Sequence, residues 1–270
     1  MSAHGGRAHH RAKPRVRAVG EPDGSDDSCR GDRLLMGNAC DHRAAAQTRQ
    51  PCPPRWSGYA GAITAATGVA FIALVVLLQW LRGDLDWIDA QLSAYLHGAY
   101  GLLLRTAYCL LAAAMVWLAL GLYAALAPVV CSRTVVGLFC MAAVGLSAVA
   151  IGDSWMPVLA PDAATMVHLL SANTAFLCVI AAILLQSWYF RRDRWWRQHF
   201  VPAFGLGLVA FALLLFHVSV TSAPPGISQK SAIVAIVSWM VLVGRWLARD
   251  VHAQAACLPH SRDNARVNQP

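Results

Sequence analysis

Six long hydrophobic runs, separated by short polar connections, constrain the fold of this 270-residue chain more than any other feature. The hydrocarbon core of a bilayer is about 30 Å thick, so a helix that crosses it needs about twenty apolar residues. Each run is close to that length, and we therefore predict an all-α fold, a bundle of six transmembrane helices. The expected spans are residues 58–81, 106–127, 134–151, 163–190, 200–220 and 231–247.

The basic residues between the runs predict the orientation of the bundle. Of the 22 Lys and Arg residues, all but Arg82, Arg105 and Lys230 lie on the side that carries both chain ends. Cytoplasmic loops of membrane proteins carry an excess of basic residues. We therefore expect both termini in the cytoplasm and the bundle in the inner (plasma) membrane of a bacterium.

The segments outside the spans differ in composition from the membrane domain, which we expect at residues 57–249. Residues 1–56 are polar and lack hydrophobic periodicity, which predicts a disordered basic tail. Met36 offers an alternative start, so the sequence leaves open whether residues 1–35 are translated. Residues 250–270 are again polar, and we expect a second disordered tail there.

The charge distribution and the cysteine positions argue against nucleic-acid binding, a disulfide framework and a zinc site. The net charge of +8 is accounted for by the cytoplasmic excess of basic residues, and no aromatic-interleaved basic stripe indicates base stacking, so we expect no nucleic-acid partner. None of the eight cysteines lies in an outer connection, and no CxxC or Cys/His spacing is typical of zinc. We therefore predict neither a disulfide framework nor a cofactor.

The acidic connection between the first two spans, residues 82–105, combines aromatic and apolar residues. This composition predicts a segment that lies in the membrane interface or re-enters the bundle before the second helix. Asp89, Ser93 and His97 recur every four residues within it, so in a helical segment they would share one face.

Polar residues gather at the outer ends of the predicted helices, where ionisable groups near a bilayer need partners. Between helices they would meet in one outward-facing pocket, the usual place for a site in a bundle. We expect Ser93, His97, Asp153, His168 and His217 to line this pocket. The full set of candidate ligand-binding residues is His97, Asp153, His168, Ser171, His217, Gln229 and Lys230.

Several functions remain open for this pocket. The leading hypothesis is a non-enzymatic protein that binds a lipid or small amphiphile. One alternative is a membrane-embedded enzyme that uses His168 and Asp153 as an acid/base pair on a lipid-like substrate, with Ser93 as a further candidate catalytic residue. A small transporter is another alternative, although no inverted repeat is visible. His97, His168 and His217 are weak candidates for metal ligands, and all these groups also suit a purely structural role at helix ends.

Two further patterns predict contacts with lipid and between helices. Arg191, Arg192, Arg194 and Arg197 form the strongest basic run, and we expect them to bind anionic lipid of the inner leaflet, in addition to general contact with membrane lipids. Glycines within the spans allow helices to approach closely. The glycines predicted to do so are Gly137, Gly145, Gly205 and Gly207. Nothing in the sequence indicates the oligomeric state.

Three short motifs, in order along the chain, resemble those of one known family. Residues 88–95, leading into 98–101, resemble the D-x-x-x-S-x…G-x-x-G entry to the second helix of the domain-of-unknown-function 998 family. Gly152-Asp153 followed by residues 167–172 resembles its junction between the third and fourth helices. Residues 226–230 resemble its G-x-x-Q-[RK] entry to the last helix.

The resemblance covers residues 58–248 and implies a six-helix prokaryotic membrane protein. It implies no mechanism, because no activity is established for the family. The residues that it singles out are Ser93, Asp153, His168, Gln229 and Lys230.

Overall fold

The computed structural model describes residues 53–127, 130–220 and 222–267, with side chains described except at 153–159, 161, 252 and 254–267. The predictions for residues 1–52, including most of the N-terminal tail, lie outside the described residues. Within the described part of the chain all regular secondary structure is helical, and six helices are long and apolar enough to cross a membrane. The predicted all-α fold with six transmembrane helices is confirmed.

The helices differ from the predicted spans mainly at their ends. They are α2 (Arg55–Leu81), α3 (Gly101–Ala125), α4 (Arg133–Leu159), α5 (Pro161–Phe190), α6 (Phe200–Ser219) and α7 (Pro225–Val267), with short 3-10 helices η1 (Leu92–Leu96) and η2 (Arg197–His199). Two helices begin at a proline, which needs no hydrogen-bond acceptor at the first helical position. The last helix continues past residue 249, into the stretch for which we predicted a disordered tail, and the alanines there favour a helix.

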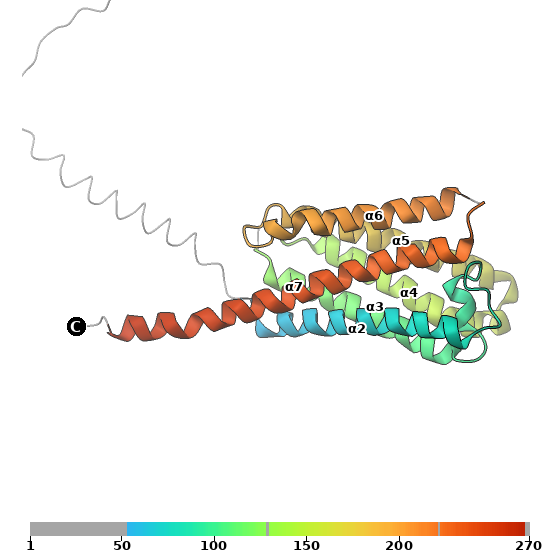
Figure 1. Ribbon diagram of the computed structural model, residues 1–270, viewed down its shortest axis with the longest axis horizontal. Coiled ribbons are helices and arrows are strands. Elements are labelled where there is room, and N and C mark those ends of the chain that lie inside the picture. The colour runs from blue at the N-terminus through green and yellow to red at the C-terminus, as the bar shows by residue number, and fades with distance from the viewer. Residues whose placement is uncertain (1–52, 128–129, 221, 268–270) are drawn as a thin grey trace, which may run out of the picture. The chain divides into compact units, whose positions relative to one another are not determined.

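The six long helices run alongside one another (Figure 1). Each packs against its neighbours in chain order, and α7 also packs against α2, which closes a ring of contacts. Many side chains on the outer faces are large and apolar, including Val69, Leu170 and Val201, each more than half exposed. A soluble monomer rarely exposes so much contiguous apolar surface, whereas a bilayer requires it.

Glycines allow α2 and α7 to pack with their backbones in contact. A Cβ atom on Gly61 would overlap the carbonyl oxygen of Gly244, and one on Gly68 would lie 2.6 Å from a methyl group of Val241. These pairs also show that the two helices are antiparallel. The start of α2 and the end of α7 therefore lie at one end of the bundle, called here the terminal end.

Two of the four glycines that we predicted at helix contacts lie there. A Cβ atom on Gly145 would lie 2.7 Å from the carbonyl oxygen of Ser171, and one on Gly207 would lie 2.9 Å from Ile183. The prediction is wrong for Gly137 and Gly205, which have open space around the Cβ position. Their faces point outward, and composition alone does not distinguish the outer face of a membrane helix from the inner one.

A buried carboxylate organises the connections at the terminal end. Asp193 follows α5, is 2% exposed, and accepts backbone hydrogen bonds from Trp195 at 2.9 Å and from Trp196 at 3.2 Å. It also accepts one at 3.2 Å from Ala127, which follows α3. One side chain thus joins two connections that are far apart in the sequence.

The basic run surrounds this buried carboxylate. Its four arginines, residues 191, 192, 194 and 197, are all exposed, and the guanidinium of Arg191 lies 4.3 Å from the ring centroid of Trp188. Their binding to anionic lipid, like the cytoplasmic placement of the termini, stays a prediction.

Candidate functional site

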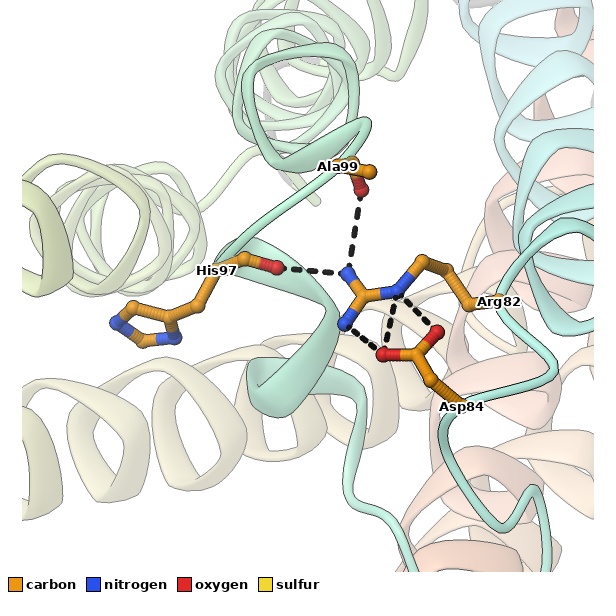
Figure 2. Close-up of polar contacts among 4 residues, drawn as sticks. All are labelled: Arg82, Asp84, His97 and Ala99. Atoms are coloured by element: carbon orange, nitrogen blue, oxygen red, sulfur yellow. Dashed lines mark hydrogen bonds and ion pairs between the residues drawn. The ribbon is translucent and has the colours of Figure 1, made fainter.

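At the end of the bundle opposite the terminal end, an arginine fixes the segment that connects α2 to α3 (residues 82–100). Figure 2 shows the guanidinium of Arg82 between the carboxylate of Asp84 and two backbone carbonyls. Its Nε and Nη2 atoms donate to Asp84 at 2.8 Å, and Nη1 donates to the carbonyls of His97 at 2.7 Å and Ala99 at 3.1 Å. The start of the segment is therefore tied to its end.

Backbone geometry explains how residues 97–100 can form a tight turn beside the Arg82 guanidinium. Gly98 has a φ of 77°, in the left-handed region that glycine adopts at no steric cost, and lies beside the guanidinium. Tyr100 has a φ of 66° and precedes α3 directly. A non-glycine residue in this region is uncommon, and the bonds of Arg82 to the two preceding carbonyls hold the turn in place.

The hydrogen bonds from Arg82 lower the pKa of the Asp84 carboxyl below its ordinary value. The pair therefore contributes stability above that ordinary pKa, near pH 4, and the contribution is lost as the pH falls through the lower, folded-state value. We expect Asp84→Asn to loosen residues 97–100 at neutral pH but to change little in strong acid, measured by hydrogen exchange. The effect is small because the Asp84 side chain is 62% exposed. Equal loosening at both pH values would contradict the pairing.

The middle of the connecting segment packs into the bundle. In η1, Leu92, Tyr95 and Leu96 are at most 1% exposed and belong to the main hydrophobic core. Burial raises the pKa of the Tyr95 hydroxyl, which has no hydrogen-bond partner among the described residues. Only these five residues, 92–96, form a helical turn here, so Asp89, Ser93 and His97 do not share the face of one continuous helix. The interfacial or re-entrant position of the segment stays a prediction.

The first turns of α7 hold the same segment from the other side. The amide of Ile227 donates to the carbonyl of Ile88, and the amide of Leu92 donates to Oε1 of Gln229, both at 2.9 Å. Nζ of Lys230 donates to the carbonyl of Trp87 at 2.7 Å. The ammonium also lies 5.1 Å from the ring centroid of Tyr95, within cation–π range.

Below this segment lies a cavity of about 80 Å³, several times the roughly 10–15 Å³ that one water needs. Most of the lining side chains are apolar and come from α3, α4, α5 and α7. Among the described residues it is lined by Phe71, Ser93, Tyr108, Leu111, Met115, Ala142, Leu146, Val149, His168, Ala172, Ala175, Phe176, Val179, Gln229, Ile233, Ile236, Val237 and Met240.

Three of the candidate site residues meet at this cavity. Ser93 reaches it from η1, and His168 and Gln229 reach it from the second turns of α5 and α7. These positions lie at the same end of their elements, whereas Met115 and Met240 lie farther along α3 and α7. The cavity therefore has a polar end below the connecting segment and an apolar body deeper in the bundle.

The other candidate residues are not among the described side chains that line the cavity. The His97 side chain is exposed, and its ring points away from Arg82 (Figure 2). Nδ1 of His217 lies 2.7 Å from Oγ of Ser228, and the Lys230 ammonium binds the connecting segment. The carbonyl of Ser171 lies at the α4–α5 contact. Asp153 is in α4, but its side chain lies outside the described residues, so its pairing with His168 stays a prediction.

The described residues offer no group of three or more His, Cys, Asp or Glu side chains placed to hold a metal ion. The roles of Arg82, Gly226 and the apolar body of the cavity were not predicted from the sequence. The one available signal was Gly226 in the G-x-x-Q-K motif, since glycine allows a close backbone approach. A Cβ atom there would lie 2.5 Å from the carbonyl oxygen of Ala90.

These observations define a multi-pass membrane protein with an internal cavity below a packed connecting segment. A family model described as "Protein of unknown function (DUF998)" matches residues 65–246, so the chain belongs to this family, as its motifs predicted. No curated protein and no solved structure matches the chain. The family description names no activity, and a function has to be argued from the cavity.

Proposed function

We propose that this protein binds a lipid or small amphiphile, with the apolar chain in the cavity and the polar group beside Ser93, His168 and Gln229. The observation that carries the proposal is the division of one cavity into an apolar body and a polar end. The excess of basic residues at the terminal end supports placing the polar end on the outer side of the membrane.

The apolar body favours hydrocarbon over water. A water in a cavity needs two to four polar partners, and cavities lined by Leu, Ile and Phe stay dry and bind apolar molecules. Met115 and Met240 lie in this part of the lining, and their unbranched, polarisable side chains adapt to ligands of varied shape. An acyl or other hydrocarbon chain fits this chemistry.

The polar end supplies hydrogen bonds but no fixed charge among its described side chains. Because Oε1 of Gln229 already accepts the amide of Leu92, its NH₂ group is left to donate. The hydroxyl of Ser93 and the ring of His168 can each donate or accept. A ligand with a hydroxyl or carboxyl group at one end suits this set better than a phosphate, which would call for Arg or Lys.

We expect Ala172→Phe, which adds an aromatic ring on the cavity wall, to weaken binding of the fluorescent fatty acid parinaric acid at least about tenfold, a loss of about 1.4 kcal/mol. Full-length protein in lipid nanodiscs is titrated with parinaric acid, and the fluorescence of the fatty acid is followed. Ala181→Phe is the matched control, because Ala181 is an exposed residue of the same helix outside the cavity, and it keeps wild-type affinity.

Polar-end variants extend the same titration. Ser93→Ala and His168→Ala each remove one hydrogen bond and weaken binding by about two- to tenfold. Equal binding by wild type and Ala172→Phe would overturn the proposal. Chemical conversion of the bound lipid by wild type but not by His168→Ala would replace it with the enzyme alternative.

A further inference from the structure

A second hollow lies on the outer face of the bundle, toward the terminal end and far from the cavity's polar end. It has a volume of about 460 Å³ and follows one face of α7, between α2 and α6. Figure 1 shows α7 lying between these two helices. The α7 residues that line it recur at helical spacing, at positions 238, 241, 242, 245, 246 and 249, and the walls are Val69, Ile72 and Leu206. We call it the α7 groove.

The two ends of the α7 groove differ in chemistry. Toward the middle of the helix its lining is apolar except for Ser238, and at the terminal end Arg245 and Arg249 stand one turn apart on the same face. Both arginines are exposed, and neither has a hydrogen bond or ion pair within the described part of the chain.

No carboxylate among the described residues neutralises these arginines from the groove. Asp250, the nearest acidic residue in the sequence, does not line the groove, and its Oδ2 lies 3.8 Å from Nε2 of His199. Trp246 lines the groove and is held in place because its ring stacks on His199, with centroids 4.2 Å apart. The groove thus has a rigid aromatic wall beside two unneutralised guanidinium groups.

We propose that the α7 groove is a binding site for one anionic phospholipid of the leaflet at the terminal end. The phosphate lies between Arg245 and Arg249, and an acyl chain runs along α7 between α2 and α6. Charged residues within a membrane helix are costly and need partners. Arginine matches phosphate with a planar fork of donors, and it reaches the headgroup level with its stem along apolar surface. The site shares no residue with the cavity and does not depend on the proposed function.

The test compares phosphatidylglycerol with phosphatidylcholine bound to the full-length protein. Detergent-solubilised protein is titrated with each lipid, and the occupancy of the first bound lipid is read by native mass spectrometry. An anionic lipid gains roughly 1 kcal/mol for each basic residue near it, which is about fivefold in affinity. We expect wild type to prefer phosphatidylglycerol by about 30-fold, with about fivefold lost in Arg245→Gln or Arg249→Gln and nearly all lost in the double variant.

A matched double variant keeps the net charge change equal. Arg55→Gln with Arg133→Gln removes two exposed arginines that do not line the groove and are not part of the basic run, and it keeps the preference within about twofold. Leu242→Trp leaves the charges and fills the groove, so it weakens both lipids. An equal loss in the two double variants would show general attraction to the charged surface and overturn the site. A wild-type preference for phosphatidylglycerol in the Arg245→Gln, Arg249→Gln double variant would also overturn the site. So would the absence of any preference in wild type.

Discussion

We expect Asp193→Ala to lower the free energy of unfolding by about 3 kcal/mol. The Asp193 carboxylate is 2% exposed and accepts the backbone amides of Ala127, Trp195 and Trp196. Leaving a buried amide without its acceptor costs about 1–3 kcal/mol. Water can accept hydrogen bonds from only some of the three amides, so part of this cost remains. Because the carboxylate links two connections, its removal loosens both together. The free energy of unfolding is measured by denaturation in mixed detergent micelles.

Two variants separate this role from general charge effects. Asp193→Asn keeps one acceptor oxygen, so its loss is smaller than that of alanine. Arg194→Ala changes an exposed residue next in the chain and stays within about 0.5 kcal/mol of wild type. If Asp193→Ala were no worse than Arg194→Ala, the three hydrogen bonds would not hold the terminal end together.

The six spans were predictable because a single physical requirement determines them. A helix in a bilayer satisfies its backbone internally and needs an apolar surface of fixed length, and both requirements act along the sequence. The ends of the helices were less predictable. α3 begins at Gly101, five residues before the predicted start at Thr106, because the turn at Tyr100 is held by Arg82, which is distant in the chain.

The polar residues show where sequence reasoning stops. Ser93, His168 and Gln229 were predicted to belong to one site, and the structure brings them to one cavity because each lies near the same end of its element. Lys230 has the same position along α7, yet its ammonium binds the carbonyl of Trp87. Residue type and depth are visible in a sequence, whereas the rotation of a side chain toward a cavity or toward a backbone carbonyl depends on tertiary packing.

The G-x-x-Q-K motif is the clearest case of a pattern with two interpretations. From the sequence, Gln229 and Lys230 are candidate ligand-binding residues. In the structure they also hold the connecting segment, together with the amide of Ile227. The motif therefore has a structural role on which any role in binding depends. The connecting segment places Ser93 at the polar end of the cavity, and the motif holds that segment in position.

We expect Gly226→Ala to lower the free energy of unfolding by about 3 kcal/mol and to weaken ligand binding in the cavity. A Cβ atom at Gly226 would lie 2.5 Å from the carbonyl oxygen of Ala90 and 2.6 Å from that of Ile88. Real Cβ atoms do not approach backbone oxygens so closely, so α7 and the connecting segment must separate. That separation lengthens the Ile227–Ile88, Gln229–Leu92 and Lys230–Trp87 hydrogen bonds together.

Gly83→Ala is the matched control for this substitution. Gly83 lies in the same connecting segment, but a Cβ atom there has nothing within 4 Å, so alanine changes stability by about 0.5 kcal/mol or less. Hydrogen exchange at residues 87–92 distinguishes the cause, because separation from α7 exposes these amides in Gly226→Ala and leaves them protected in Gly83→Ala. If both variants kept wild-type protection and stability, the first turns of α7 would not hold the segment, and the placement of Ser93 at the cavity would need another explanation.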